Sequence, residues 1–177
     1  MKKRQLDHVL RAAGKIVDDT QFIIIGSQAL HGKFPDLPDD IVMSAEVDLF
    51  AKNHAERTEW INAIGVDSPF HVMHGYYADP VDEKTAVLPK EWKARLVNLT
   101  PGDTDGVSGL CLDPHDIAIS KYVAKRDKDR EFNRELVRRG VIQKERLLEL
   151  LAVTPVSPVV RKRIQSDINR DFAAASG

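Results

Sequence analysis

A short, wholly apolar run that ends in a tight turn sets the strongest limit on how this chain can fold. Residues 22–25 are all apolar and are followed at once by Gly26 and Ser27. Such a run bounded by a turn signal predicts a buried strand. Residues 46–50 alternate acidic and apolar side chains before a final Phe, which predicts a second strand with one polar and one apolar face.

The two acids of the second strand, Glu46 and Asp48, project from the same face because successive strand side chains alternate. They are about 6 to 7 Å apart along the strand, a spacing at which two carboxylates can share a hard cation. Mg²⁺ prefers oxygen ligands and retains waters that a substrate phosphate can replace. Gly26 and Ser27 would bring backbone N–H groups close to a phosphate at a helix start. The pattern predicts adjacent sites for Mg²⁺ or Mn²⁺ and for a phosphate.

On these residues the chain resembles the nucleotidyltransferase superfamily, the polymerase-beta-like fold. Its signature is a Gly-Ser turn followed by an acid-x-acid strand, which here reads Gly26-Ser27 and Glu46-x-Asp48. The likeness extends to a bacterial subgroup of uncharacterised nucleotidyltransferase-like proteins related to the toxins of abortive-infection toxin-antitoxin pairs. Three segments carry it: residues 26–50, residues 74–77 with 85–89 and Trp92, and residues 113–116 leading to Lys121 and 126–129.

The resemblance implies attack by an acceptor hydroxyl on the α-phosphate of a nucleoside triphosphate, with loss of pyrophosphate. Metal ions would polarise the phosphate, so the protein mainly supplies positioning and charge. Glu46 and Asp48 are then catalytic metal ligands, with Glu46 standing where the family usually has Asp. Active members place a third carboxylate on a later strand. The nearest candidate is Asp79, just past the end of a strand expected over residues 70–77.

A basic segment offers cations for the nucleotide phosphates. Residues 121–163 hold thirteen Lys or Arg against six acids, although the formal net charge of the whole chain is −1. Such a segment suits a nucleotide or RNA. One alternative is a solvated helix with i,i+4 pairs of side chains. Another is that Lys125 and Asp129 pair at i,i+4 and neutralise each other at the edge of the core. In the functional interpretation Lys121 is catalytic, and the resemblance adds further nucleotide-binding residues to Lys125: Arg126, Lys128 and Asp129, the last orienting the cations.

The remaining patterns predict an α/β (α+β) fold, a small mixed sheet with flanking helices. Strands are expected over residues 21–25, 45–51, 70–77, 96–99 and 110–112. Helices are expected over residues 6–17, after Gly26 with Ser27 as its cap, over 56–64, from Pro114 to about Arg139, over 144–151, and after Pro158. The loop 35–40 is rich in Pro and Asp and suits a lid beside the site.

At 177 residues the chain has the length of about one domain. We expect a nucleotidyltransferase-like α/β core over residues 1–113 and a helical C-terminal part over 114–177. The single cysteine, Cys111, excludes an internal disulfide and favours a reducing compartment. No apolar run approaches the roughly 20 residues that span a bilayer, and no signal-type stretch follows the basic start. We therefore expect a cytoplasmic protein without a membrane partner.

The sequence thus predicts a metal-dependent nucleotidyltransferase that moves a nucleoside monophosphate from a triphosphate to an acceptor hydroxyl. RNA, a protein or a small molecule would serve as acceptor, and RNA or an antitoxin protein as a further partner. The alternative is a non-catalytic module of the same fold that acts by interaction, inside a toxin-antitoxin pair. A third carboxylate close to Glu46 and Asp48 favours the enzyme, and a salt bridge filling the cleft favours the module.

Overall fold

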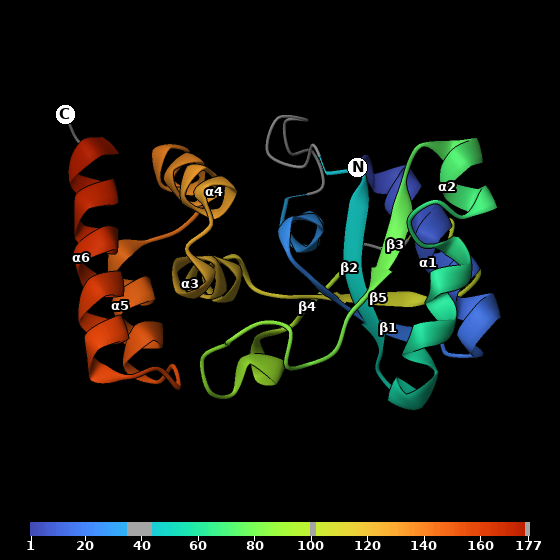
Figure 1. The fold of residues 1–177 in the computed structure, drawn as a ribbon, viewed down its shortest axis with the longest axis horizontal. Helices are drawn as coiled ribbons and strands as arrows, with labels where there is room; N and C mark the ends of the chain where they lie inside the picture. The colour runs from blue at the N-terminus through green and yellow to red at the C-terminus, as the bar shows by residue number, and fades with distance from the viewer. Residues whose placement is uncertain (35–43, 100–101, 176–177) are drawn as a thin grey trace. The chain divides into compact units, whose positions relative to one another are not determined.

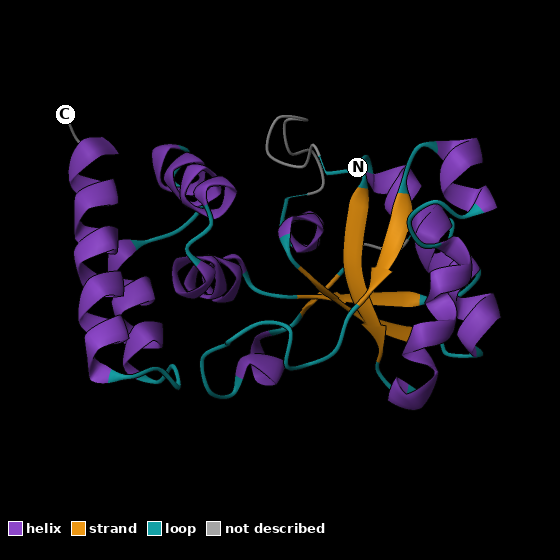
Figure 2. Ribbon diagram, viewed as in Figure 1, coloured by secondary structure: helices purple, strands orange, loops and turns teal. Residues whose placement is uncertain are grey.

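The computed structural model describes residues 1–34, 44–99 and 102–175. It contains two compact units, residues 1–85 with 96–113 and residues 86–95 with 114–177. Across its described residues the first unit builds a five-stranded mixed sheet with helices, and the second unit is helical (Figures 1 and 2). The expected α+β class is confirmed. Within the described ranges no helix combines the length and apolar character needed to cross a membrane.

The sheet of the first unit has the strand order β3-β2-β1-β5-β4. The central strand β1 (Gln21–Ile25) pairs antiparallel with β2 (Glu46–Ala51) and parallel with β5 (Ser108–Cys111). Strand β3 (Tyr77–Pro80) joins β2 in parallel, and β4 (Val97–Asn98) joins β5 antiparallel. Because β1 is central and buried, its side chains read as one continuous apolar run rather than an alternation. The predicted strands at β1, β2, β4 and β5 are confirmed.

Helices of the first unit flank this sheet. Figure 1 shows α1 (Lys3–Val17), α2 (Pro69–His74) and the 3-10 helix η2 (Ala55–Ile64) gathered on one side. The 3-10 helix η1 (Ser27–Gly32) follows β1 directly and contacts β5. Helix α1 presents an apolar stripe at helical spacing, and the whole stripe is buried: Leu6, Val9, Leu10, Ala13 and Val17.

The strand predicted over residues 70–77 is wrong, because most of it is helix α2. The Ser68 hydroxyl caps this helix by accepting the backbone N–H of His71 at 3.1 Å. Pro69 occupies the first helical position, and Gly75 ends the helix at φ 74°. A Ser cap, a first-turn proline and a terminal glycine are all helix signals, and together they outweigh the strand propensity of the segment. Strand β3 therefore begins where the predicted strand ended.

The one long helix predicted at the start of the second unit is also wrong. It is divided into α3 (Pro114–Ala124) and α4 (Asp127–Arg138). Lys125 adopts a left-handed conformation, φ 62°, and stops α3. The Asp129 carboxylate then accepts the backbone N–H of Arg126 at 3.3 Å, at the start of α4. No Gly or Pro marks the break, so the apolar spacing alone predicts one helix.

Two further helices complete the described part of the second unit, α5 (Lys144–Ala152) and α6 (Pro158–Ala175), and both agree with the predicted positions. The segment that this unit takes from the middle of the chain is anchored by an ion pair. Arg95, the last residue of the 3-10 helix η3 (Trp92–Arg95), donates two hydrogen bonds of 2.9 and 2.8 Å to the fully buried Asp116 carboxylate. Bidentate pairs of this kind are strong and directional.

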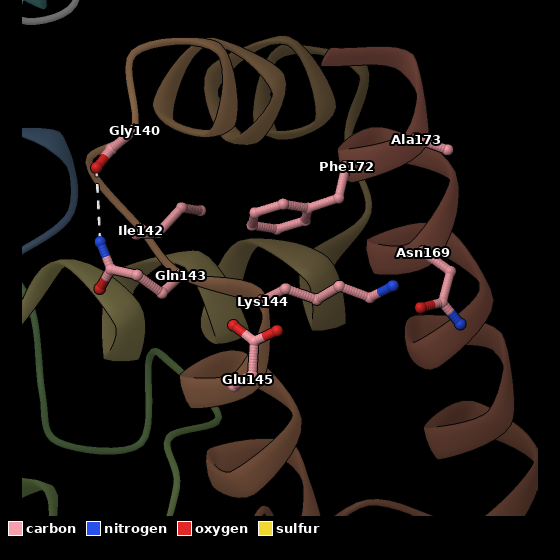
Figure 3. Close-up of a pocket in the computed structure, with 8 residues that line it drawn as sticks. All are labelled: Gly140, Ile142, Gln143, Lys144, Glu145, Asn169, Phe172 and Ala173. Carbon is pink, nitrogen blue, oxygen red and sulfur yellow. Dashed lines mark hydrogen bonds between the residues drawn. The ribbon is translucent and has the colours of Figure 1, made fainter. Parts of the chain in front are cut away.

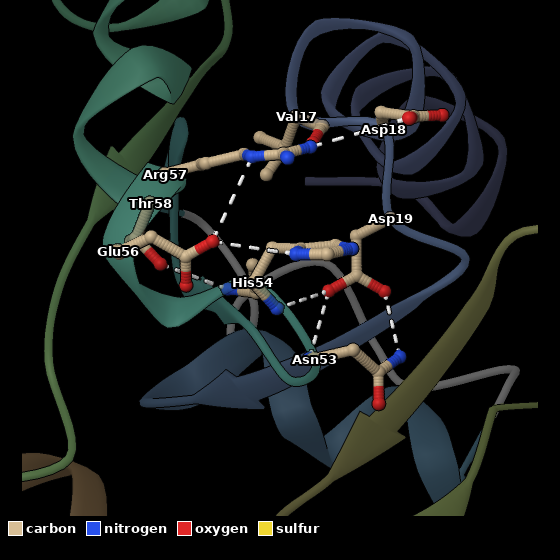
Figure 4. A network of polar contacts seen from close by, with 9 residues as sticks. Val17, Asp18, Asp19, Asn53, His54, Glu56, Arg57 and Thr58 are labelled. Carbon is tan, nitrogen blue, oxygen red and sulfur yellow. Dashed lines mark hydrogen bonds and ion pairs between the residues drawn. The ribbon is translucent and has the colours of Figure 1, made fainter.

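Asp19 ties β1 to β2 at the end of the sheet opposite Gly26 (Figure 4). Its Oδ1 accepts the backbone N–H of Gln21 at 2.9 Å and the side-chain amide of Asn53 at 2.8 Å. Its Oδ2 accepts the backbone N–H groups of Asn53 at 2.8 Å and His54 at 3.0 Å. Burial alone would raise the pKa of Asp19, but these hydrogen bonds outweigh it and hold the pKa below its usual value.

Candidate functional site

The predicted carboxylates of the first unit lie on two adjoining strands. In the parallel pairing of β2 with β3, Asp48 is the register partner of Asp79, and Glu46 is the partner of Tyr77. The two-residue period of a strand puts these four positions on one face of the sheet. Asp79 does not follow a strand end, as the sequence predicted, but lies inside β3. A third carboxylate therefore stands beside the first two.

Negative charge accumulates at this end of the sheet. Glu46 and Asp48 are half-buried, whereas Asp79 is exposed. Partial desolvation, followed by the charge of Glu46, raises the pKa of Asp79. Burial, the hydrogen bond to Glu46 and the charges of all three carboxylates raise the pKa of Tyr77 to about 12. Like charges held together in this way favour binding of a proton or a cation.

Gly26 lets the backbone pass close to one of these carboxylates. At the end of β1, Ile25 is the register partner of Asp48, and the next residue, Gly26, has φ 69°. A Cβ on Gly26 would lie only 2.1 Å from Oδ2 of Asp48, so both the conformation and the contact require glycine. Gly26, and not Ser27 as predicted, is the cap of η1, and Ser27 is the first residue of that helix.

The donor set has the chemistry of a site for a hard divalent cation. Carboxylate oxygens are the ligands that Mg²⁺ prefers, and one or two suffice when waters and substrate phosphates complete the coordination. Among residues 1–34, 44–99 and 102–175, no three or more His, Cys, Asp or Glu side chains converge closely enough to hold an ion between them. Two of these carboxylates can therefore bind an ion together with waters, and substrate phosphates can then replace some of the waters. The predicted lid, residues 35–40, lies outside the described residues.

In the second unit, the structure brings Lys121, Arg126 and Asp129 together. The Lys121 Nζ lies 3.0 Å from Oδ1 of Asp129, and the Arg126 Nε lies 2.8 Å from its Oδ2. Asp129 is fully buried. Burial would raise its pKa, but the hydrogen bonds and charges of both cations hold the pKa below its usual value. Two cations share one carboxylate, so the cluster keeps a net positive charge.

The other predicted nucleotide-binding lysines are placed differently. Lys125 does not pair with Asp129 at i,i+4, as one interpretation of the sequence expected, because it lies at the break between α3 and α4. It lines a narrow crevice together with Lys121 and Arg130. Lys128 is exposed on α4. The cations of this region therefore occupy one end of α3 and the start of α4.

A separate hollow of about 420 Å³ lies in the second unit, where the loop after α4 meets α5 and α6 (Figure 3). The Phe172 ring and the Ile142 side chain form its apolar part, and Lys144 and Glu145 border it. None of the sequence-predicted site residues is among its lining residues, which are Gly140, Ile142, Gln143, Lys144, Glu145, Asn169, Phe172 and Ala173.

Tyr77 is a residue of the carboxylate site that the sequence did not reveal. Its hydroxyl donates a hydrogen bond of 3.0 Å to Oε2 of Glu46. The available signal was the alternation of Tyr77, the buried Ala78 and Asp79, which places the two polar side chains on one strand face. The predicted strand ends at residue 77, so this alternation lies outside it.

Comparison with known families decides the assignment. Residues 2–173 match the family described as nucleotidyltransferases of unknown function, DUF6036. The chain belongs to this nucleotidyltransferase family. No curated protein and no solved structure matches the chain. The predicted superfamily is confirmed by a match over almost the whole length of this nucleotidyltransferase, and the match does not extend to the toxin-related subgroup.

Proposed function

We propose that this nucleotidyltransferase depends on a divalent metal and transfers a nucleoside monophosphate from a triphosphate to an acceptor hydroxyl. The observation that supports it most directly is the alignment of Glu46, Asp48 and Asp79 on one face of β2 and β3. The absence of a side chain at Gly26 lets the Asp48 carboxylate lie close against the backbone of the turn. An interaction module without catalysis has no need of three neighbouring carboxylates, whose repulsion costs stability.

In this proposal Glu46, Asp48 and Asp79 supply the ligands of Mg²⁺ or Mn²⁺, with no more than two of them on one ion. The metal, when bound, would polarise the phosphate and offset its charge. Asp48 is the principal ligand, because it lies between Asp79 and the Gly26 turn in the strand register. The acceptor oxygen bonds to the α-phosphorus, the bond from that phosphorus to the pyrophosphate oxygen breaks, and the hydroxyl proton is released. The carboxylates fix the position of the triphosphate for this in-line displacement.

Gly26 and Ser27 are assigned a phosphate contact. Helix η1 is a 3-10 helix of six residues, so the contact relies on local donors, the backbone N–H groups and the Ser27 hydroxyl, rather than on a long helix dipole. The positive φ of Gly26 turns the backbone beside the carboxylates. A phosphate oxygen held there would be close to a cation bound by Asp48.

The cations of the second unit are assigned to phosphate binding as well, with Lys121 acting in catalysis. In this proposal Asp129 orients Lys121 and Arg126, with which it forms ion pairs. Lys125 and Lys128 contribute further positive charge. This assignment is supported by the family resemblance of these positions and by the arrangement of charge within the second unit.

RNA is the acceptor that best suits the charge distribution. Thirteen Lys or Arg against six acids over residues 121–163 provide a surface for a phosphate backbone. The resemblance to toxin nucleotidyltransferases leads to the same choice, and it would add an antitoxin protein as a partner. Proteins and small molecules with a hydroxyl group are the acceptors to test next.

Thermal unfolding with each of the four nucleoside triphosphates, with and without Mg²⁺, tests the nucleotide site. A ligand at a hundred times its dissociation constant adds about 2.7 kcal/mol, and each kcal/mol raises the midpoint by about 2 to 4 °C in a domain of this size. We expect a Mg²⁺-dependent rise for the wild type and none for Asp48→Asn. Asp105→Asn, which removes a carboxylate near the opposite end of the sheet, should respond like the wild type.

The outcomes separate the parts of the proposal. A rise that is independent of Mg²⁺ would contradict the metal dependence, and an equal rise in Asp48→Asn would contradict the site. No rise with any triphosphate would favour the interaction module and a search for a partner protein. Where the expected rise is found, transfer of label from an α-³²P triphosphate to RNA then identifies the acceptor.

A further inference from the structure

The hydroxyl of Tyr77 contacts a proposed metal ligand without being a ligand itself. We propose that Tyr77 is a positioning residue that orients the Glu46 carboxylate toward a divalent cation. This inference rests on the metal site of the proposed function and adds a residue that the sequence did not assign. It is carried by a hydrogen bond, a strand register and a ring contact, all within the first unit.

The strand register brings the two side chains together. Glu46, at the start of β2, is the direct partner of Tyr77, at the start of β3. Parallel neighbours in register project from the same face of the sheet, and the Tyr77 hydroxyl reaches Oε2 of Glu46 at 3.0 Å. Both residues are half-buried. The hydrogen bond occupies one lone pair of the carboxylate and leaves the others for a cation.

Helix α2 contacts the Tyr77 ring through His71. The His71 ring lies 4.5 Å from it, centroid to centroid, at an interplanar angle of 55°. His71 is itself fixed, because its Nδ1 accepts the backbone N–H of Asp67 at 3.0 Å. Accepting at Nδ1 places the ring proton of the neutral imidazole on Nε2. A continuous series of contacts therefore runs from the start of α2 through His71 and Tyr77 to Glu46.

Glu46 needs such support more than Asp48 does. A glutamate side chain has one more rotatable bond than an aspartate, so holding its carboxylate in one orientation costs more conformational entropy. Partners that hydrogen-bond to a metal ligand set its orientation, and their loss typically lowers metal affinity 10- to 100-fold. Tyr77 is such a hydrogen-bond partner of Glu46.

The test is a titration of the full chain with Mn²⁺ alone, in which the free ion is measured by electron paramagnetic resonance. We expect Tyr77→Phe, which removes only the hydroxyl, to weaken Mn²⁺ binding about 10- to 100-fold. The neighbouring Tyr76→Phe is the matched control, because the Tyr76 hydroxyl bonds to Nδ1 of His8 at 2.8 Å instead of to a carboxylate. Its Mn²⁺ affinity should equal that of the wild type.

A double-mutant cycle with Glu46→Ala separates positioning from a general structural effect. If Tyr77 acts through Glu46, Tyr77→Phe should change Mn²⁺ affinity no further once Glu46 is removed. Additive losses would overturn the inference, and so would a Tyr77→Phe affinity equal to that of the wild type while Asp48→Asn has lost binding. A wild type that binds no Mn²⁺ would instead overturn the metal site and this inference together.

Discussion

At Gly26, the absence of a side chain allows β1 to turn directly beside a proposed metal ligand. Gly26→Ala would introduce a Cβ 2.1 Å from Oδ2 of Asp48 at a residue with φ 69°. We expect destabilisation of about 1 to 3 kcal/mol from backbone strain and a loss of Mn²⁺ affinity, because the carboxylate must move. Urea unfolding and the Mn²⁺ titration measure the two effects separately.

Gly106→Ala is the matched control for this substitution. Gly106 also has a positive φ, 83°, but a Cβ there meets no atom within 4 Å. The control should therefore show a comparable loss of stability, about 1 to 2 kcal/mol, with unchanged Mn²⁺ affinity. Unchanged Mn²⁺ affinity in Gly26→Ala as well would mean that the contact with Asp48 has no role in binding.

At the scale of elements, the Asp19 carboxylate joins the start of β1 to the residues after β2. In Asp19→Asn, one oxygen becomes an N–H₂ donor that faces backbone or amide donors, so two of the four hydrogen bonds are lost. We expect a loss of roughly 2 to 3 kcal/mol in urea unfolding at pH 7. Asp18→Asn is the control. The Asp18 side chain is 96% exposed, and its change should stay within about 0.5 kcal/mol.

The free energies of unfolding of the wild type and Asp19→Asn should also differ in their dependence on pH. The pKa of Asp19 is lower in the folded chain than in the unfolded chain, so the unfolded state binds the proton first as the pH falls. The stabilisation by Asp19 is therefore complete above the unfolded pKa of about 4 and is lost as the pH falls through the lower folded value. The stability gap between wild type and Asp19→Asn should narrow below about pH 4. A constant gap down to pH 3 would contradict the lowered pKa.

Elements with local signals were predictable, and those that depend on long-range contacts were less so. The strand at β1 followed from an apolar run, and α1 from its helical spacing. Helix α2 has local signals too, Ser68, Pro69 and Gly75, which the strand propensity of the residues between them obscured. The break at Lys125 has no such signal. The break depends on Asp129. The ion pair of Asp129 with Lys121 spans eight positions and forms only when α3 and α4 pack together.

The residues of the candidate site also differ in how far the sequence could predict them. Glu46 and Asp48 could be predicted because a period of two along one strand determines their common face. Asp79 could be named only as a candidate, and Tyr77 was missed, since both depend on the register between β2 and β3. A register between distant strands is set by packing and by the connecting segments rather than by either strand alone.

At the scale of the whole molecule, the chain passes between its two units three times, after residues 85, 95 and 113. The middle segment belongs to the second unit, and both of its neighbours in sequence belong to the first. Lys90 donates its backbone N–H to the carbonyl of Val153 at 3.2 Å, which adds to the pairing of Arg95 with Asp116. Loss of the contacts of residues 86–95 therefore destabilises the second unit. It also loosens the segment that connects residues 1–85 to residues 96–113 of the first unit.

Asp116→Asn tests whether the chain unfolds as the single domain that its length predicts. Removing the charge of the buried Asp116 breaks its bidentate ion pair with Arg95, with an expected loss of about 3 kcal/mol. Hydrogen exchange along a urea series, followed on peptides from β1 and α3, should give one shared midpoint in the wild type and a lower shared midpoint in the variant. Asp127→Asn, whose side chain is 95% exposed, should keep the wild-type midpoint. Separate midpoints for β1 and α3 would show two domains, each with its own stability.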